Sequence, residues 1–517
     1  MESITKLQGK LREAEDILQY VSKELEHFAE DKTVGTELNF SKIKLRGEQY
    51  SFYEHPLKKQ IFQDEYFALM IYIISLGDKK EEGWTLLYRI VAGCGYQKDL
   101  QNLTTDAMTL TEERLSEIIR MIYSAEMART FALDSLMICY HMGADDAQLQ
   151  FLSDLYELLK LDKNFLTEAV QFVKVFDATF WDNLAEKSRA WKFLTARDLA
   201  TYIGAYPAAS LEEAAKLNYK RLVISGITYT SNDVLKLDDW KSQEILFLNC
   251  RFENCGGIYS ENKVVKFAEC TFDGNIVRYA DSHERSYTTS YCWTDKKYSY
   301  SRGFLNLNNA NFVRCIFKNF SDSVPMMYLN GSAIYECEFE KIKQSPSPSV
   351  IFNINNSEVT KTKFIDCVNI MPFRNNACVN SIHEISCDYY HTGCLIHSAN
   401  TRWRENLFIN CRNSTEGDRY ARGSSHIMIL DKNSSCTGCT FENNVATFTY
   451  DTYSGKAKQD CALLGLRDSA AYDNKNGTVS NLERISLTIF QVGDKLYDNF
   501  YNRIHSDFRV DSNLYNG

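Results

Sequence analysis

Proline and long apolar runs are both scarce in this chain. Only six of its 517 residues are proline, which suits strand ladders that need every backbone N–H. No stretch of 18 apolar residues occurs, which argues against a transmembrane helix. No apolar segment follows the opening Met-Glu-Ser-Ile-Thr-Lys, so the sequence predicts no signal peptide. We therefore expect a cytoplasmic protein without a membrane partner.

Basic residues are also fewer than acidic ones. The formal net charge is −10, and nucleic-acid phosphates require a basic face, so we do not expect nucleic acid as a partner. An acidic nucleic-acid mimic needs a continuous negative stripe, which scattered Lys and Arg interrupt here. The sequence lacks a P-loop, a dinucleotide fingerprint, a nucleophile elbow and an HExxH motif. These absences favour a protein without an organic cofactor.

Cysteine, by contrast, is abundant, with 16 residues. One interpretation is an oxidised, secreted scaffold, and the other is a reduced protein that uses Cys as a small interior residue. We favour the second, because several cysteines recur at one position of a repeat and packing alone explains them. Cys436-Thr-Gly-Cys439 is a CxxC, but no second pair has zinc-ligand spacing, so we predict no zinc site there.

One phrase repeats between residues 245 and 444: Cys or a small residue, any residue, Phe, any residue, and usually Asn or Asp. It is centred on Phe252, Phe272, Phe317, Phe339, Phe364, Phe408 and Phe441. The gaps between them are 20, 45, 22, 25, 44 and 33 residues, most of them one or two multiples of about 22. Such a period indicates one supersecondary unit per repeat, which needs neighbours to bury its apolar face.

Each repeat is predicted to contain short strands and tight turns. Apolar or small residues precede each Phe by five positions, and no helical period is present. They are Phe247, Phe267, Phe312, Ile334, Val359, Trp403 and Cys436. Asn-rich turns such as Asn308-Asn309 and Asn330-Gly331 tolerate the left-handed backbone of a sharp corner.

Three-stranded coils with Asn corners resemble the right-handed parallel β-helix family, whose relatives include pectate-lyase-like and pentapeptide-repeat solenoids. The resemblance covers roughly residues 219–470. It implies that the phenylalanines and the repeated cysteines, such as Cys250 and Cys270, form interior ladders. The Asn or Asp after each Phe would form a corner ladder of coil-to-coil hydrogen bonds. It implies no particular chemistry, because this fold serves lyases, hydrolases, tail spikes and scaffolds alike.

The N-terminal half is predicted to be helical. Residues 4–28 carry apolar side chains at spacings of 3 and 4 over four heptads, so residues 1–35 form a coiled-coil-like helix. This helix either pairs with a second copy or partner chain, which we favour, or folds back on its own helical domain.

Residues 57–178 contain two similar helical hairpins, each with an apolar helix that ends at Gly and acidic residues. This segment resembles the TerB-like domain of tellurite-resistance proteins. The resemblance implies an adaptor module of bacterial stress and phage-defence systems. It also implies a divalent cation at the acidic corners, on Asp78, Asp145 and Asp146. Lys79 and Lys80 weaken such a site at the first corner, and plain helix caps are the other explanation of these carboxylates.

Caps are expected at both ends of the solenoid, because terminal coils otherwise expose apolar side chains and strand edges. Residues 179–218 are predicted to form a helical linker and N-terminal cap. Within them, Ser210-Leu-Glu-Glu213 has capping-box spacing. Residues 471–517 are predicted to close the other end.

The segment 279–303 interrupts the repeat and mixes aromatic with charged residues. Insertions in solenoids become loops on one flank, often the binding flank. Amphipathic aromatic residues suit contact with a protein or a sugar. The candidate binding residues are His283, Tyr287, Tyr291, Trp293 and Tyr298.

The sequence therefore predicts a multidomain α + β protein, with an all-α N-terminal half and a right-handed parallel β-helix in the C-terminal half. No Asp or Glu recurs at a fixed position in successive coils, although β-helix hydrolysis chemistry needs paired carboxylates. We expect a non-enzymatic recognition or scaffold subunit of a bacterial stress or anti-phage defence system, with a protein partner. The alternative is a polysaccharide lyase or glycoside hydrolase.

Overall fold

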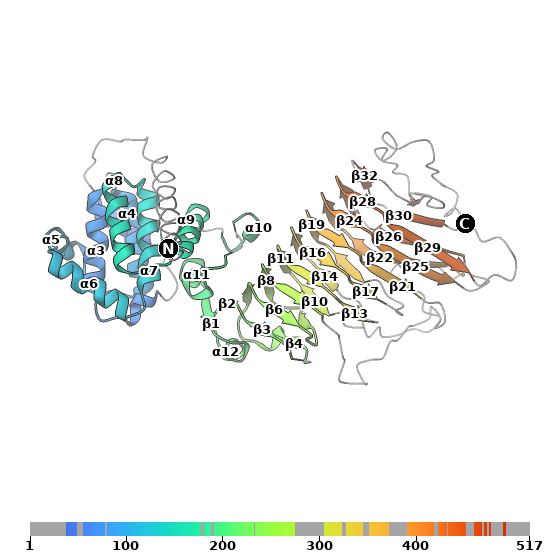
Figure 1. Ribbon diagram of the computed structural model, residues 1–517, viewed down its shortest axis with the longest axis horizontal. Coiled ribbons are helices and arrows are strands. Elements are labelled where there is room, and N and C mark those ends of the chain that lie inside the picture. The colour runs from blue at the N-terminus through green and yellow to red at the C-terminus, as the bar shows by residue number, and fades with distance from the viewer. Residues whose placement is uncertain are drawn as a thin grey trace, which may run out of the picture. The chain divides into compact units, whose positions relative to one another are not determined.

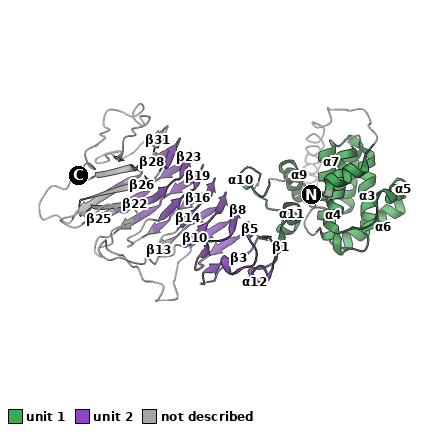
Figure 2. Ribbon diagram, turned by 180° about the vertical axis from the view of Figure 1, so that it is seen from behind, with its two compact units in different colours: residues 1–207 green, residues 208–517 purple. Residues whose placement is uncertain are grey.

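The protein forms two compact units, residues 1–207 and 208–517 (Figure 2). The computed structural model describes residues 38–48, 55–77, 80–176, 180–187, 191–231, 233–274, 304–322, 327–344, 351–371, 390–417, 422–431, 433–450, 460–467, 470–472, 475–476 and 490–492. The predicted heptads at 4–28 lie outside these residues, as does most of the predicted C-terminal cap.

The first unit is helical, as the sequence predicts. Its α-helices and 3-10 helices are α2 (Phe40–Glu48), η1 (Pro56–Lys59), α3 (Gln63–Leu76), α4 (Lys80–Cys94), η2 (Leu100–Leu103), α5 (Thr104–Met108), α6 (Glu112–Ser124), α7 (Ala128–Met142), α8 (Asp146–Leu158), α9 (Lys163–Val175), α10 (Leu184–Lys187) and α11 (Ala196–Ile203) (Figure 1). Thr111 caps α6 by accepting the Arg114 N–H. Gly143 and Gly204 end α7 and α11 in the left-handed conformation, at φ 65° and 68°.

Glycines let the central helices of this unit approach closely. α3 and α7 are buried over most of their length, and α4 packs against both α7 and α2. A Cβ at Gly83 of α4 would lie 2.4 Å from the Met142 sulfur, and one at Gly47 of α2 would lie 2.5 Å from the Tyr88 Cβ. At Gly47 the Thr85 backbone oxygen, at 2.8 Å, also blocks a Cβ, so this crossing requires glycine, whereas at Gly83 the flexible Met142 side chain would have to shift.

The second unit is a stack of parallel coils, whose strands form four sheets (Figure 1). Sheet A comprises β1 (Tyr206–Ala208), β2 (Arg221–Ser225), β5 (Glu244–Leu248), β8 (Val264–Ala268), β11 (Ala310–Val313), β15 (Ala333–Tyr335), β19 (Glu358–Thr360), β23 (Arg402–Arg404), β27 (Ser435–Thr437) and β31 (Ala470–Tyr472). Sheet B comprises β3 (Thr228–Tyr229), β6 (Arg251–Glu253), β9 (Thr271–Asp273), β12 (Ile316–Lys318), β16 (Glu338–Glu340), β20 (Lys363–Ile365), β24 (Leu407–Ile409), β28 (Thr440–Glu442) and β32 (Lys475–Asn476).

The other two sheets complete each coil. Sheet C comprises β4 (Leu235–Lys236), β7 (Ile258–Ser260), β10 (Leu305–Asn308), β14 (Met327–Asn330), β18 (Phe352–Asn355), β22 (Tyr390–Ala399), β26 (Arg422–Asp431), β30 (Asp460–Arg467) and β33 (Phe490–Val492). Sheet D comprises β13 (Ser321–Asp322), β17 (Lys343–Gln344), β21 (Val368–Met371), β25 (Arg412–Gly417) and β29 (Val445–Tyr450). Strands pair in parallel with the strand one coil away. The predicted parallel-stranded solenoid is therefore confirmed in the C-terminal half.

The repeat phenylalanines form a column inside the coils. Rings in neighbouring coils lie 4.5–4.9 Å apart between centroids, at interplanar angles of 4–10°. A second column starts with Phe247, Phe267 and Phe312, whose rings stack at 5.1 and 4.9 Å. The register continues it through the other residues that precede each Phe by five positions. These side chains are buried, so the predicted interior stacking is confirmed.

Cysteines form a third interior column, between sheets A and B. Cys250, Cys270, Cys315 and Cys337 are buried, and the Cys270 thiol donates to the Phe247 carbonyl at 3.3 Å. The Cys315 N–H donates to the Cys337 sulfur at 3.4 Å. Burial raises the pKa of the Cys270 and Cys315 thiols well above the ordinary value. Packing and hydrogen bonding therefore account for the repeated cysteines, which are free thiols in the described part of the chain.

Left-handed residues make the corners between sheets. At the corner from sheet A to sheet B they are Gly226, Asn249, Glu269, Arg314, Glu336, Lys361, Glu405 and Gly438. Charges alternate along this column, and Arg314 bridges Glu269 at 2.5 Å and Glu336 at 3.4 Å. After sheet B, the Asn410 amide donates to the Asp366 carboxylate of the previous coil at 3.1 Å. This bond confirms the predicted corner ladder.

Lys361 gives a direct test of corner strain. Its φ is 51°, and a non-glycine residue in this conformation costs roughly 1–2 kcal/mol. We expect Lys361→Gly to raise the free energy of unfolding by about 0.5–1 kcal/mol, after the entropy that glycine loses on folding. In the matched variant Lys363→Gly, on strand β20, the same change should lower it by about 0.5–1 kcal/mol. Denaturant titrations would measure both, and equal losses would contradict the corner assignment.

A short helix lies between the first two strands of sheet A. α12 (Leu211–Lys216) starts at Ser210, whose hydroxyl accepts the Glu213 N–H at 3.1 Å, as its sequence predicts. α12 packs against β2. Within 179–218 the chain also forms β1, which the sequence analysis did not anticipate.

Candidate functional site

Two uncharged columns of side chains lie on the outward face of sheet C. Along β10, β14 and β18, buried apolar residues alternate with partly exposed polar ones. The register aligns Tyr259, Asn306, Tyr328, Asn353 and His397 in the first column, and Asn308, Asn330, Asn355 and Ala399 in the second. Of these, His397 is buried, at 4% exposed, and the columns continue to Lys236 before Tyr259 and to Asp431 after Ala399. Neighbouring coils repeat every ~4.8 Å. We call these nine residues the sheet C face.

Carboxamides on this face divide into two groups. Those of the second column support the corner: Asn330 Oδ1 accepts from the Asn356 amide at 2.6 Å, and Asn355 Oδ1 accepts the Ala399 N–H at 3.1 Å. Among the described residues, no hydrogen bond involves the side-chain carboxamide of Asn306 or the side-chain NH2 group of Asn353. The first column therefore offers hydrogen-bonding groups to a ligand on a rigid, neutral surface.

Repeat insertions fall at one corner of the solenoid. The connections between described strands that lead into sheet C span residues 274–304, 323–326, 345–351, 372–389, 418–421 and 451–459. Their unequal lengths, together with the longer strands β22, β25 and β26, explain the uneven gaps between the repeat phenylalanines. The predicted binding residues His283, Tyr287, Tyr291, Trp293 and Tyr298 lie in the first connection, outside the described residues. That connection ends at β10, one of the strands that carry the sheet C face.

The acidic corner of the second hairpin is a helix cap. Asp145 accepts the Gln148 N–H at 2.9 Å, and the Gln148 side chain accepts the Asp145 N–H at 3.2 Å. The Gln148 amide also donates to the Ile73 carbonyl at 2.8 Å, which joins this corner to the end of α3. Asp146 is exposed in the first turn of α8, and Asp78 lies outside the described residues. A cation at these corners stays a prediction.

A buried carboxylate that the sequence analysis did not single out joins three helices. Asp134 of α7 accepts hydrogen bonds from the hydroxyls of Tyr66 in α3 and Tyr202 in α11, both at 2.5 Å. The His55 Nε2 lies 3.0 Å from Asp134 Oδ2, and neither side chain is exposed. The Leu57 N–H donates to the His55 Nδ1 at 3.2 Å. Every donor around Asp134 comes from a different segment, so this network fixes their positions relative to one another.

Burial and neighbouring side chains act in opposite directions on the charge of His55. Burial, the largest influence, lowers its pKa, but the Asp134 carboxylate and Cys94 together raise the pKa to about 10. The Leu57 N–H requires an unprotonated Nδ1, so it opposes this rise. It does not reverse the rise, because a carboxylate is a stronger partner than a backbone amide. Burial also raises the pKa of the Tyr66 and Tyr202 hydroxyls well above the ordinary value, so they remain donors.

The raised pKa of His55 predicts a loss of stability in alkaline solution. The ordinary pKa is 6.5 and the folded one is about 10, so the stabilising contribution is complete below the first value and disappears as pH rises through the second. We expect the melting temperature of the helical unit to fall between these two pH values in the wild type, and to fall less in His55→Gln. Thermal melts across this range would measure both. If the melting temperatures of the wild type and His55→Gln fall equally with pH, the raised pKa of His55 would be contradicted.

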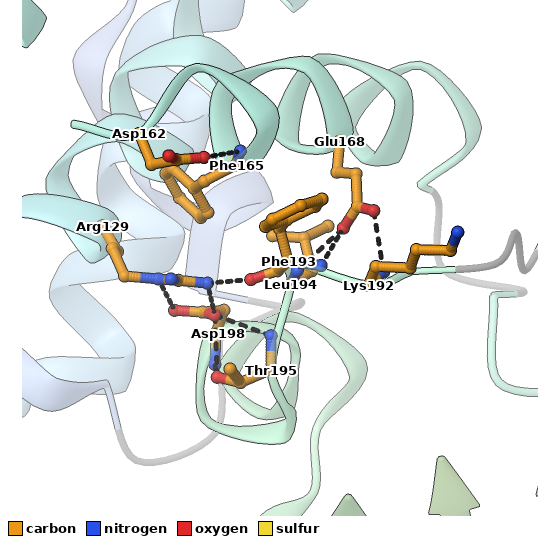
Figure 3. A network of polar contacts seen from close by, with 9 residues as sticks. All are labelled: Arg129, Asp162, Phe165, Glu168, Lys192, Phe193, Leu194, Thr195 and Asp198. Carbon is orange, nitrogen blue, oxygen red and sulfur yellow. Dashed lines mark hydrogen bonds and ion pairs between the residues drawn. The ribbon is translucent and has the colours of Figure 1, made fainter. Parts of the chain in front are cut away.

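A second polar network holds the segment before α11 (Figure 3). Arg129 of α7 donates to the Asp198 carboxylate and to the Phe193 carbonyl, and its guanidinium lies 4.1 Å from the centroid of the Phe165 ring. Glu168 of α9 accepts three consecutive backbone N–H groups, from residues 192–194, at 2.7–2.8 Å. Together these contacts fasten residues 192–198 to α7 and α9. They position α11, which places Tyr202 against Asp134.

These networks had only a weak signal in the sequence. Asp134 is the one carboxylate of α7 and is flanked by apolar residues, which suggests a buried, satisfied acid, but its partners lie 68–79 residues away along the chain. Because their separations follow no motif spacing, only the folded helices bring them together.

Comparison with known proteins finds no matching family model, no matching curated protein and no matching solved structure. In the described part of the chain, no group of three or more His, Cys, Asp or Glu side chains is arranged to hold a metal ion. Nor does any helix there have the length and hydrophobicity needed to cross a membrane.

Proposed function

We propose that this protein is a non-enzymatic recognition or scaffold subunit that binds a protein partner through the sheet C face and the adjoining 279–303 segment. The observation that carries this proposal is the neutral pair of Tyr and Asn columns, on a chain whose formal net charge is −10. Tyrosine is enriched at protein interfaces, and charged residues are depleted at their centres. A rigid face also loses little conformational entropy on binding.

The finer fold assignments belong to the same proposal. A right-handed winding is supported by the strong preference for right-handed connections between parallel strands. A TerB-like first unit is supported by its two helical hairpins, α3–α4 and α7–α8. That likeness and a cytoplasmic location together motivate a role in bacterial stress or anti-phage defence. Self-association through residues 4–28 is tested by mass measurement in solution, where a monomer at micromolar concentration would exclude it.

The test of partner binding is affinity purification from native host cells. It compares the full-length protein, a variant that lacks residues 281–301, and Asn353→Arg on the sheet C face. We expect a protein that copurifies with the wild type to be lost from both variants. Glu358→Arg, on sheet A, is the matched control and should retain it. Retention by both test variants would remove this face from the proposal, and recovery of a polysaccharide instead would favour the lyase or hydrolase alternative.

A further inference from the structure

Tyr and Asn alternate along the first column of the sheet C face. From β7 to β18 the column carries Tyr259, Asn306, Tyr328 and Asn353, with one residue in each coil. All four side chains are half-buried, and none of them is ionised at neutral pH. The column therefore presents a large side chain and a small one in turn, at a repeat of ~4.8 Å.

This pattern is complementary to its own reverse, because Tyr-Asn-Tyr-Asn read backwards is Asn-Tyr-Asn-Tyr. When a second copy faces the first with its solenoid axis reversed, Tyr259 lies opposite Asn353 of that copy, and Asn306 lies opposite its Tyr328. The two-fold axis between the copies then runs parallel to the strands and passes between β10 and β14. Facing sheets pack about 10 Å apart, and large side chains opposite small ones let the two layers interdigitate at a constant distance.

Charge also favours this face for contact between copies. The outward columns of sheet B include Arg251 and Lys363, and those of sheet A include Glu358. Two copies repel one another, since each has a formal net charge of −10, and charged residues are depleted at the centres of interfaces. Lys236 and the buried His397 bound the four uncharged coils of the first column.

We propose that the partner bound by the sheet C face is a second copy of this chain, in a two-fold dimer with antiparallel solenoid axes. This inference rests on the proposed function, because it names the partner of the same face, and it is separate from self-association through residues 4–28. In a two-fold contact each kind of Tyr–Asn pair occurs twice. The four coils span only about 14 Å along the axis, which is less than a permanent dimer needs, so the dimer is reversible and depends on concentration.

The test measures self-association of the full-length protein by analytical ultracentrifugation over a range of concentrations. Tyr259→Glu and Asn353→Lys should each weaken self-association by about tenfold or more, because each places an unpaired charge inside the contact. The two substitutions change the net charge in opposite directions, so net charge alone does not explain a loss in both. Thr271→Lys, on sheet B, is the matched control and should associate as the wild type does.

Combining the two substitutions in one chain tests the antiparallel arrangement. The double variant Tyr259→Glu/Asn353→Lys should recover the association of the wild type, since each introduced carboxylate faces the introduced ammonium of the other copy. Within one chain the two positions lie three coils apart, about 14 Å, which is too far for them to form an ion pair with each other. The exchanged pair Tyr259→Lys and Asn353→Glu repeats the test if Tyr259→Glu does not fold.

Three results would overturn the proposal. They are a wild type that stays monomeric at every concentration, single variants that associate as the wild type does, and a double variant that is as weak as the single ones. The proposed function fails separately. If Asn353→Lys retains self-association but loses a different protein that copurifies with the wild type, the sheet C face binds a protein partner and the second copy is not that partner.

Discussion

Replacing Asp134 with alanine is expected to lower the free energy of unfolding of the helical unit by about 3–5 kcal/mol. The substitution leaves His55, Tyr66 and Tyr202 buried without their shared acceptor. An unsatisfied buried donor costs about 1–3 kcal/mol, and the lost side chain adds a cavity. Hydrogen–deuterium exchange in the peptides of α3 and α7 would measure the loss in this unit separately from the solenoid.

Asp154→Ala is the matched control for this prediction. Asp154 is an exposed carboxylate of α8 whose one hydrogen bond to a described residue comes from the Gln150 amide, at 2.9 Å, four residues earlier in the same helix. Its removal should change the stability by less than about 0.5 kcal/mol. Tyr66→Phe should lie between the two variants, because it removes one donor and leaves the carboxylate its other partners. Similar exchange in Asp134→Ala and Asp154→Ala would show that the network contributes little.

Replacing Phe317 with alanine should destabilise the solenoid by about 3–5 kcal/mol. Its ring is 0% exposed and stacks on Phe272 and on Phe339 at 4.5 Å in each case. The substitution therefore opens a cavity between two neighbouring coils. Because coils stabilise each other through their interfaces, hydrogen exchange should accelerate in β9 and β16 as well as in β12.

The adjacent residue provides the control. Ile316 lies on the same strand, points outward and is 42% exposed, so Ile316→Ala should cost less than about 1 kcal/mol. Phe317→Leu, which retains much of the buried volume, should fall between the two. If Ile316→Ala and Phe317→Ala have equal effects on chemical denaturation, the interior column does not stabilise the coils.

Periodicity made the solenoid predictable. A parallel coil places the same position of each repeat at the same place in the cross-section, so the Cys-x-Phe-x-Asn phrase reports interior and corner positions directly. The stacking of Phe252 on Phe272 and the bond from Asn410 to Asp366 follow from that rule. Sheet D and the strand β1 were not anticipated. These strands lie outside the Phe-centred phrase, so its period does not report them.

The sequence by itself determined which residues line the coils, where the Asn-rich corners lie and which segments are helical, because each of these depends on local spacing. It did not reveal the left-handed Glu, Arg and Lys residues at the corner from sheet A to sheet B. Only the tertiary structure decided which side chains meet. His55, Tyr66 and Tyr202 converge on Asp134 from separate segments, Glu168 receives the 192–194 amides, and Tyr259 aligns with Asn306 across an insertion. Such contacts depend on how helices and coils pack against one another. The spacing of residue types along the chain does not reveal that packing.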